Sequence, residues 1–309
     1  MNPVPTPFFP RLHRPLLLGV ALLTLLGISQ PAEAYLVNEW EPLTMEGARP
    51  KTPQNIQTGT HWRDPLSEAN LLWIRGGCFA MGSPPRATGR EMDEGPVTQQ
   101  CVSDFWLGET EITQGQWRRV MHNNPAKFRK GDRYPVENVS WEEVEEFITS
   151  LNEQNPLNVQ FRLPTEAEWE YACRQGGQRT VFPGASEPGR IGWHRSNSDG
   201  SPHEVATRAP NRLGLKDMSG NVWEWVSDRY HASLETPSED QEHQNDRERF
   251  YATRGGGWND DGAALRCANR GFQSITTRRN DLGLRLAASL KNKEKKIKYR
   301  QTDIKHMPF

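Results

Sequence analysis

The hydrophobic and polar positions along the chain predict three amphipathic helices, each with the same start signal. Thr113, Ser140 and Thr165 are each followed three residues later by Gln or Glu, which is the spacing of a capping box. In residues 141–151 the larger apolar side chains recur at the spacing of one helix face. We therefore expect helices to begin directly after these three hydroxyl residues.

Short apolar runs between turn-forming residues predict strands. One predicted strand extends over residues 71–81 and a second over residues 97–107, with a polar loop rich in Pro, Gly and Glu between them. This arrangement predicts a hairpin with Cys78 on one strand and Cys101 on the other. Further strand-like segments occupy residues 251–258, 265–270 and 282–288.

Loops are expected to make up much of the fold. The chain has 26 Gly and 23 Pro, and only 35% of its residues are hydrophobic. Residues 175–214 show little periodicity, and the acidic segment 234–249 is expected to be an exposed loop. A length of 309 residues allows one sizeable domain or two small ones.

The N-terminus has the three parts of a secretory signal peptide. Basic residues precede a short apolar run at residues 16–28, and small residues lead to Ala34. We therefore predict a signal peptide over residues 1–34, cleavage after Ala34, and a periplasmic or secreted product. The apolar run is shorter than a membrane span requires, so no membrane span is predicted.

The mature chain is divided by composition. Residues 35–65 are polar and interrupted by prolines, which predicts an irregular leader, and residues 66–289 carry the predicted elements of one domain. The last residues, 290–309, form a basic tail that we expect to be solvated, with contact to acidic lipid or polymer as the alternative.

Charge and cysteine content limit the function classes. The formal net charge is −1, so the basic surplus typical of nucleic-acid binding is missing and we expect no nucleic-acid partner. The four cysteines are widely spaced, without a CxxC pair, which in an exported protein predicts structural disulfides. Four cysteines allow three pairings, of which the predicted hairpin favours Cys78 with Cys101.

An ordered set of motifs resembles the formylglycine-generating enzyme, or sulfatase-modifying factor, family. Examples are RLPTEAEWEYA at 162–172 and GNVWEW at 220–225. The others lie at residues 76–83, 109–113, 116–117, 135–141, 254–258 and 282–285. The resemblance implies an α+β fold of the C-type-lectin-like kind, loop-rich and built as a single domain.

The resemblance also implies a disulfide, and a departure from the family pattern argues against copper. Cys173 and Cys267 match the positions of a structural bridge in the family, which leaves Cys78 to pair with Cys101. Formylglycine-generating enzymes bind copper(I) through two thiolates that follow the Gly-Gly motif, because soft sulfur suits that metal. Residues 257–267 offer only the thiol of Cys267, so copper-dependent cysteine oxidation is not expected.

A structural calcium site is implied by the same family. Its ligands would be the side chains of Asp217 and Glu224 and the backbone carbonyls of Gly220 and Val222. Such a set of hard oxygens suits calcium. The alternative is a tight turn capped by Asp217, with the two tryptophans of the 220–225 motif in the core.

Two functions remain open, and the sequence does not decide whether the chain is an enzyme. The first is a modifying or maturation factor without copper, similar to non-haem-iron or pyoverdine-maturation relatives. His194, Asp199 and His203 could reach a metal, but they lack a recognisable ligand spacing and histidines of this kind are typical of surfaces. No catalytic residue is identified.

The second function is ligand binding by a monomer through the C-terminal face. Residues 258–285 resemble the variable region of diversity-generating-retroelement proteins, and the partner would be a peptide, a protein or a small molecule. Aromatic, Arg and Asn side chains favour recognition. The candidate ligand surface comprises Trp258, Asn259, Asp260, Asp261, Arg266, Asn269, Arg270, Phe272, Arg278, Arg279 and Asn280. The alternative is that these side chains only brace a loop-rich surface.

Overall fold

The three predicted helices are present in the computed structural model, which describes residues 59–235 and 250–291. They are α1 (Gln114–Met121), α2 (Trp141–Gln154) and α3 (Glu166–Cys173). Each has a complete capping box, in which the hydroxyl before the helix accepts the N–H of the third helical residue. The side chain of that third residue accepts the N–H of the cap residue in return, so the sequence-based prediction is confirmed.

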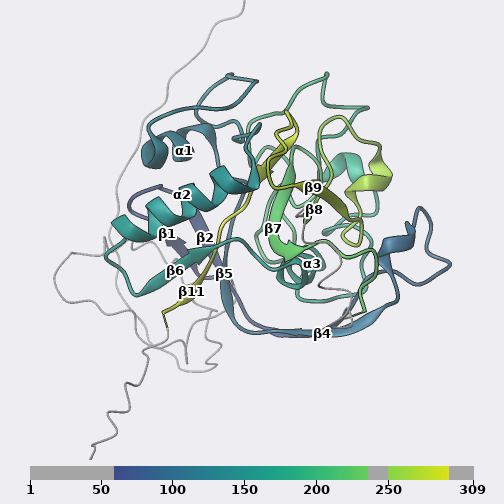
Figure 1. The fold of residues 1–309 in the computed structure, drawn as a ribbon. Coiled ribbons are helices and arrows are strands. Elements are labelled where there is room, and N and C mark those ends of the chain that lie inside the picture. The colour runs from purple at the N-terminus through teal and green to yellow at the C-terminus, as the bar shows by residue number, and fades with distance from the viewer. Residues whose placement is uncertain (1–58, 236–249, 292–309) are drawn as a thin grey trace, which may run out of the picture. The chain divides into compact units, whose positions relative to one another are not determined.

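A five-stranded sheet runs through the middle of the described fold, in the order β1-β2-β5-β11-β6 (Figure 1). Its strands are β1 (His61–Arg63), β2 (Asn70–Ile74), β5 (Phe105–Gly108), β11 (Ala287–Leu290) and β6 (Val159–Arg162). The central strands β2 and β5 read as continuous apolar runs because both faces of the sheet are covered.

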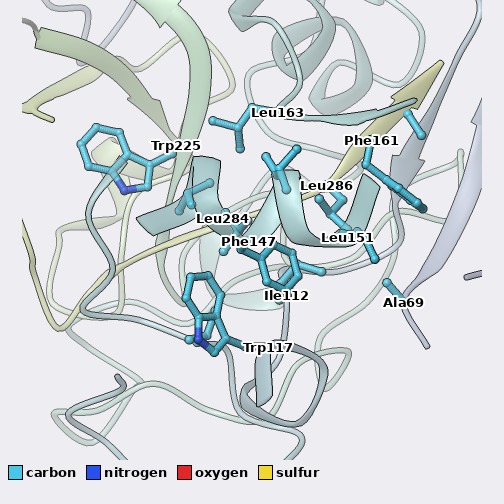
Figure 2. Close-up of a cluster of buried hydrophobic side chains, with 14 of the residues drawn as sticks. Ala69, Ile112, Trp117, Phe147, Leu151, Phe161, Leu163, Trp225, Leu284 and Leu286 are labelled. Atoms are coloured by element: carbon cyan, nitrogen blue, oxygen red, sulfur yellow. The ribbon is translucent and has the colours of Figure 1, made fainter. Parts of the chain in front are cut away.

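The two faces of this sheet join two different cores. Leu71 and Trp73 point to the core that contains α1 and α2, whereas the alternate residues Leu72 and Ile74 point to the core beside α3. Figure 2 shows the first core, where the ring of Trp117 from α1 stacks on Phe147 from α2. The helices are therefore fixed by tertiary packing rather than by their own propensity.

A second sheet of four strands carries the C-terminal half of the domain. Its order is β10-β7-β8-β9, with β10 parallel to β7 and the other pairs antiparallel. Its strands are β10 (Leu282–Leu284), β7 (Trp223–Arg229), β8 (Phe250–Arg254) and β9 (Gly271–Ser274). The predicted strand at 265–270 is wrong, because η4 (Gly262–Leu265) leads there into a buried irregular segment.

The predicted hairpin is present as β3 (Gly77–Met81) and β4 (Thr98–Val102), with Cys78 directly opposite Cys101. Each of the two long predicted strands, 71–81 and 97–107, is divided into two strands that belong to different sheets. At the crossing, the N–H of Gly76 donates to the Asp104 side chain, and a Cβ on Gly76 would lie 2.3 Å from the carbonyl oxygen of Val102. Only glycine allows this close approach.

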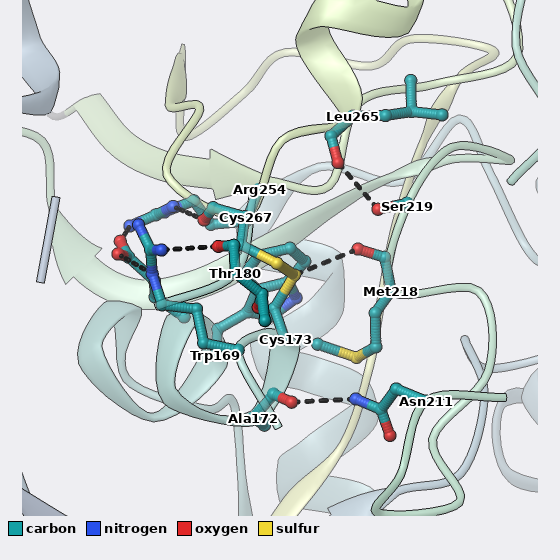
Figure 3. Close-up of a disulfide and its surroundings, with 12 residues drawn as sticks. Trp169, Ala172, Cys173, Thr180, Asn211, Met218, Ser219, Arg254, Leu265 and Cys267 are labelled. Carbon is teal, nitrogen blue, oxygen red and sulfur yellow. Dashed lines mark hydrogen bonds and ion pairs between the residues drawn. A yellow bond between two sulfur atoms is a disulfide. The ribbon is translucent and has the colours of Figure 1, made fainter. Parts of the chain in front are cut away.

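The structure contains both expected disulfides, Cys78–Cys101 and Cys173–Cys267. Cys78 and Cys101 are exposed on the hairpin, whereas Cys173 at the end of α3 and Cys267 are buried (Figure 3). The α+β, loop-rich prediction is confirmed.

Residues 61–63 of the predicted irregular leader form β1, which pairs with β2. The predicted signal peptide, most of the leader and almost all of the basic tail lie outside the described residues. Among the described residues, no helix is both long and apolar enough to cross a bilayer.

Candidate functional site

Three acidic side chains and one arginine are buried together where the GNVWEW segment meets β10 and β5. Glu111, Asp217, Glu224 and Arg285 are each at most 2% exposed. The guanidinium of Arg285 donates to both carboxylate oxygens of Glu224 at 2.7–3.1 Å. Its other bonds reach the backbone carbonyls of Gly108, Lys216 and Asp217. One cation therefore compensates one of the three carboxyl groups directly.

Glu111 is held by the backbone and side chain of the same segment. Its carboxyl accepts the Asn221 side-chain amide at 2.7 Å and the Val222 N–H at 3.0 Å. Burial raises the pKa of Glu111 well above its usual range, and the charges of Asp217 and Glu224 raise it further. The ionised form of Glu111 is therefore disfavoured by its surroundings, and a nearby cation would favour it.

Asp217 adopts a left-handed backbone conformation, with φ of 56°. Its Oδ2 accepts the N–H of Ala206 at 2.6 Å, whereas its Oδ1 is buried without a hydrogen-bond partner. Burial raises the pKa of Asp217 to about 6, and the charge of Glu224 also raises it. The Ala206 N–H and Arg285 act in the opposite direction. A buried oxygen without a donor is costly, and a bound cation would satisfy it.

The predicted calcium ligands are thus close in sequence but unequal in availability. Glu224 is already engaged by Arg285 and by the indole N–H of Trp169 at 2.6 Å. Within residues 59–235 and 250–291, no three His, Cys, Asp or Glu side chains converge so that they could hold a metal ion. The oxygen that fits a cation best is Oδ1 of Asp217. The alternative interpretation placed both tryptophans of the 220–225 motif in the core. The structure agrees with that packing, because Trp225 is fully buried and Trp223 is 9% exposed.

Above this cluster, the loop at residues 193–208 presents a stacked cation and imidazole. The His203 ring lies 3.6 Å from the centre of the Trp193 indole, and the Arg208 guanidinium lies 3.5 Å from it. Two groups at such distances must occupy opposite faces of one ring. The N–H of His203 donates to the Asn221 side chain, which ties the stack to Glu111. Here His203 is a packing residue.

His194 does not join His203 at a metal site. It is 9% exposed, and burial together with Arg208 lowers its pKa, against a smaller opposite effect of Asp261. Asp199 is exposed elsewhere on the same loop. The metal role considered for this trio therefore has no support among the described side chains, and the favoured surface interpretation is wrong for His194, which is buried.

Glu137 is a second buried carboxyl group with an unused oxygen. Its Oε1 accepts the N–H of Phe128 at 2.6 Å, and its Oε2 has no hydrogen-bond partner. Burial raises the pKa of Glu137 to about 7, with a further contribution from Asp281. The folded state therefore holds this proton at pH values where the unfolded chain has lost it.

A pH-dependent stability follows from Glu137. Because its folded pKa of about 7 exceeds the ordinary 4.5, stability falls as pH rises between these values and stays lower above them. Glu137→Gln keeps the acceptor for Phe128 and removes the ionisation, so urea unfolding at pH 8 should show a gain of up to about 3 kcal/mol. At pH 4.5 the variant and parent should be alike. The exposed Glu142→Gln is the control, and an equal gain in that variant would contradict the explanation.

Four members of the predicted ligand surface, Trp258, Arg266, Asn269 and Arg270, are buried, so their assignment to a surface is wrong. Arg266 makes a two-pronged ion pair with Glu94 at 2.6 and 2.8 Å. Arg270 does the same with Glu166 at 2.7 and 2.9 Å. Asn269 is 2% exposed. The arginines are inside because each meets a buried carboxylate from a distant part of the chain.

The remaining positions form a smaller surface. Asn259, Asp261, Phe272 and Arg278 are exposed, and Asp260, Arg279 and Asn280 are partly so. Several of them brace the fold. The carboxylate of Asp260 accepts the Trp223 indole N–H and the Gly257 N–H, and Arg279 pairs with Asp281. Trp258 is 8% exposed, and its indole N–H donates to the Asn280 carbonyl.

The residues that organise the buried cluster were not predicted as site residues. Glu111 lies in the motif at 109–113 and Arg285 in the motif at 282–285, so both were visible as parts of the family pattern. Nothing in their sequence neighbourhoods indicates that they meet Glu224. Each disulfide uses two of the four cysteines, so no thiol of this chain is free to bind a soft metal.

Comparison with known proteins agrees with this architecture. The family described as "Sulfatase-modifying factor enzyme 1-like domain" matches residues 58–290. The formylglycine-generating enzyme of Thermomonospora curvata is 35% identical over 246 residues, covering 59% of this chain and 75% of that enzyme. The bovine enzyme is 31% identical, but the chain spans only 42% of its length.

Two solved structures have a similar fold. PvdO from Pseudomonas aeruginosa has a TM-score of 0.68 and 25% identity, and the match covers 76% of this chain and all (100%) of that one. Variable protein 1 of Treponema denticola has a TM-score of 0.59 and 25% identity, with 74% of this chain and 98% of that chain covered. The similar proteins therefore include one named as an enzyme and one named as a variable protein.

Proposed function

This chain belongs to the sulfatase-modifying factor family, and from that premise we propose that it is a modifying or maturation factor that works without thiolate-bound copper. The observation that carries the proposal is the use of all four cysteines in two disulfides. Copper(I) held by cysteine requires thiolates, which a disulfide does not offer. The fold is kept while that metal site is missing.

A pyoverdine-maturation-like role is the form of this proposal that we favour. The likeness to PvdO extends over the whole of that chain. A non-haem-iron role has less support, because no three His, Cys, Asp or Glu side chains in the described part of the chain converge on one point. The two disulfides also favour a location outside the cytoplasm, consistent with the predicted signal peptide.

Two measurements test the role. The purified protein and the Thermomonospora curvata enzyme are each incubated with copper(I) and a cysteine peptide from a sulfatase, and aldehyde is captured with a hydrazide. We expect aldehyde with that enzyme only. In the native host, deletion of the gene should leave an unprocessed precursor among the exported peptides, detected by mass spectrometry and removed by complementation. Aldehyde formation by this chain, or an unchanged set of exported peptides, would contradict the proposal.

We propose that calcium stabilises the segment that contains Asp217. Support comes from the orphaned Oδ1 of Asp217 and from an excess of carboxyl groups over guanidinium in the buried cluster. Gly220 and Val222 would add carbonyl oxygens, and Glu224 would contribute to the local negative charge. The ion would supply a fixed positive charge, with no role in bond breaking.

Calcium removal is expected to destabilise the protein. EDTA should lower the melting temperature, and calcium at about 100 times its Kd should restore about 2.7 kcal/mol. Magnesium should restore less, because it demands a stricter geometry. Asp217→Asn keeps the acceptor for Ala206 but should abolish the response. A melting temperature that ignores both EDTA and calcium would exclude the site.

Ligand binding is a second candidate, favoured by the likeness to the Treponema denticola variable protein. The exposed positions available for it are Asn259, Asp261, Phe272 and Arg278, together with the partly exposed residues beside them. Two results together would favour this function over maturation. Deletion of the gene would leave the exported peptides unchanged, and the protein would capture one defined ligand whose binding Phe272→Ala and Asn259→Ala abolish.

A further inference from the structure

A cavity of about 580 Å³ lies between the β3–β4 hairpin and the loop that follows α3. Its volume is within the range of small-molecule sites. Six of its thirteen lining residues have aliphatic side chains, namely Ala80, Pro84, Ala87, Val97, Val181 and Ala268. Val97 and Val181 are 42% and 57% exposed, so aliphatic surface reaches the solvent. This cavity shares no lining residue with the buried cluster of Glu111, Asp217, Glu224 and Arg285.

The walls of this cavity are fixed by buried ion pairs. Arg266 is locked to Glu94, whose carboxylate also accepts the Ser83 hydroxyl at 2.6 Å. Arg174 donates to Glu170 at 2.7 Å and to the carbonyl of Gly82 at 2.8 Å. Charge-assisted bonds of this kind hold both sides of an opening in place. The cavity is therefore preformed.

The charge of the lining is entirely positive. Arg174, Arg179 and Arg266 line the cavity, and no Asp or Glu does. Arg174 and Arg266 are neutralised by their buried carboxylates. The side chain of Arg179 is exposed. Within the described ranges, 59–235 and 250–291, it makes no hydrogen bond or ion pair with another residue. One cation at the cavity therefore remains available for an anion.

A hydroxyl beside this arginine also lacks a partner. Thr180 Oγ1 is buried without a hydrogen bond, although the Thr180 carbonyl accepts from Arg174 at 2.6 Å. Thr180 lines the same cavity. A buried hydroxyl without a partner is unfavourable, and rotation of the Thr180 side chain toward the cavity would let an oxygen of a bound ligand relieve it. A cation and a hydroxyl donor on adjacent residues suit a carboxylate.

We infer that this cavity binds an acyl-chain carboxylate, with the chain against the apolar walls and the carboxylate at Arg179 and Thr180. A peptide fits less well. The N–H groups of Arg174 and Arg266 already donate to protein acceptors, so the carbonyl groups of a bound peptide would lack donors from them. An alkyl chain has no polar groups to satisfy. The inference concerns a site separate from the proposed maturation function.

Titration calorimetry with sodium decanoate tests the site in the full mature chain. We expect saturable binding of one decanoate, and decanol, which lacks the charge, should bind at least tenfold more weakly. Arg179→Glu should weaken decanoate binding at least tenfold. The exposed Arg190→Glu makes the same charge change outside the cavity and should leave the affinity unchanged.

Thr180→Val is the second variant, because it removes only a hydroxyl that has no partner in the fold. It should weaken decanoate several-fold without altering decanol binding or the melting temperature. The inference is overturned if decanoate does not saturate, if Arg179→Glu and Arg190→Glu weaken it equally, or if decanol binds as tightly. It is also overturned if an apolar tripeptide with a free carboxylate binds more tightly than decanoate. None of these results bears on the gene-deletion test of maturation.

Discussion

Replacing Cys173 and Cys267 together by alanine is expected to lower the free energy of unfolding by about 4 to 5 kcal/mol. The bridge closes a loop with a sequence separation of 94, so its loss frees a large part of the unfolded chain. Both cysteines are fully buried, so the change also removes packing between α3 and the segment before β9. Urea unfolding of the oxidised parent and the double variant measures the difference.

The second disulfide provides the matched comparison. Cys78 and Cys101 are exposed and have a sequence separation of 23, so replacing both by alanine should cost about 3 kcal/mol. The order of the two losses is the informative result. If the hairpin pair proves the more important one, loop length and burial do not govern stability in this domain.

Arg285→Ala is expected to destabilise the fold by about 3 to 5 kcal/mol. The substitution leaves the carboxylate of Glu224 buried with only the Trp169 indole as a donor, and it removes the donor to the Gly108 carbonyl. Arg285→Lys should recover only part of the loss, because an ammonium cannot reproduce the two-pronged guanidinium contact. Denaturant unfolding at neutral pH measures both variants.

A surface ion pair serves as the control for Arg285. Arg278 pairs with Glu143 at 2.9 Å, but its side chain is 48% exposed. Arg278→Ala should therefore cost at most about 1 kcal/mol. Equal losses at the two arginines would show that burial of the Glu224 pair does not set its contribution.

The helix starts and the hairpin could be predicted because they depend on neighbours in the sequence. The hydroxyl of Ser140 meets the backbone of Glu143 only three residues away, so the pattern and the contact coincide. Strand boundaries were harder to predict. Residues 97–107 were predicted as one strand, but the chain passes from one sheet to another within this segment. The pattern of apolar residues indicates which positions are buried, but it does not indicate which sheet a strand joins.

The candidate site was predicted less completely than the fold. The family pattern located Asp217 and Glu224, yet it did not reveal that Glu224 is already paired with Arg285. It also placed Arg266 and Arg270 on a ligand surface, where the structure buries both. Arginine is usually exposed, so a sequence pattern favours that interpretation unless the partner is known.

By itself the sequence determined the family, the three helix caps and the hairpin that carries Cys78 and Cys101. Only the tertiary structure decided which charges are inside. The carboxylates that bury Arg266, Arg270 and Arg285 lie 172, 104 and 61 residues away from them in the chain. A charged side chain becomes a core residue when folding brings an opposite charge to it, and no local pattern records a meeting over such separations.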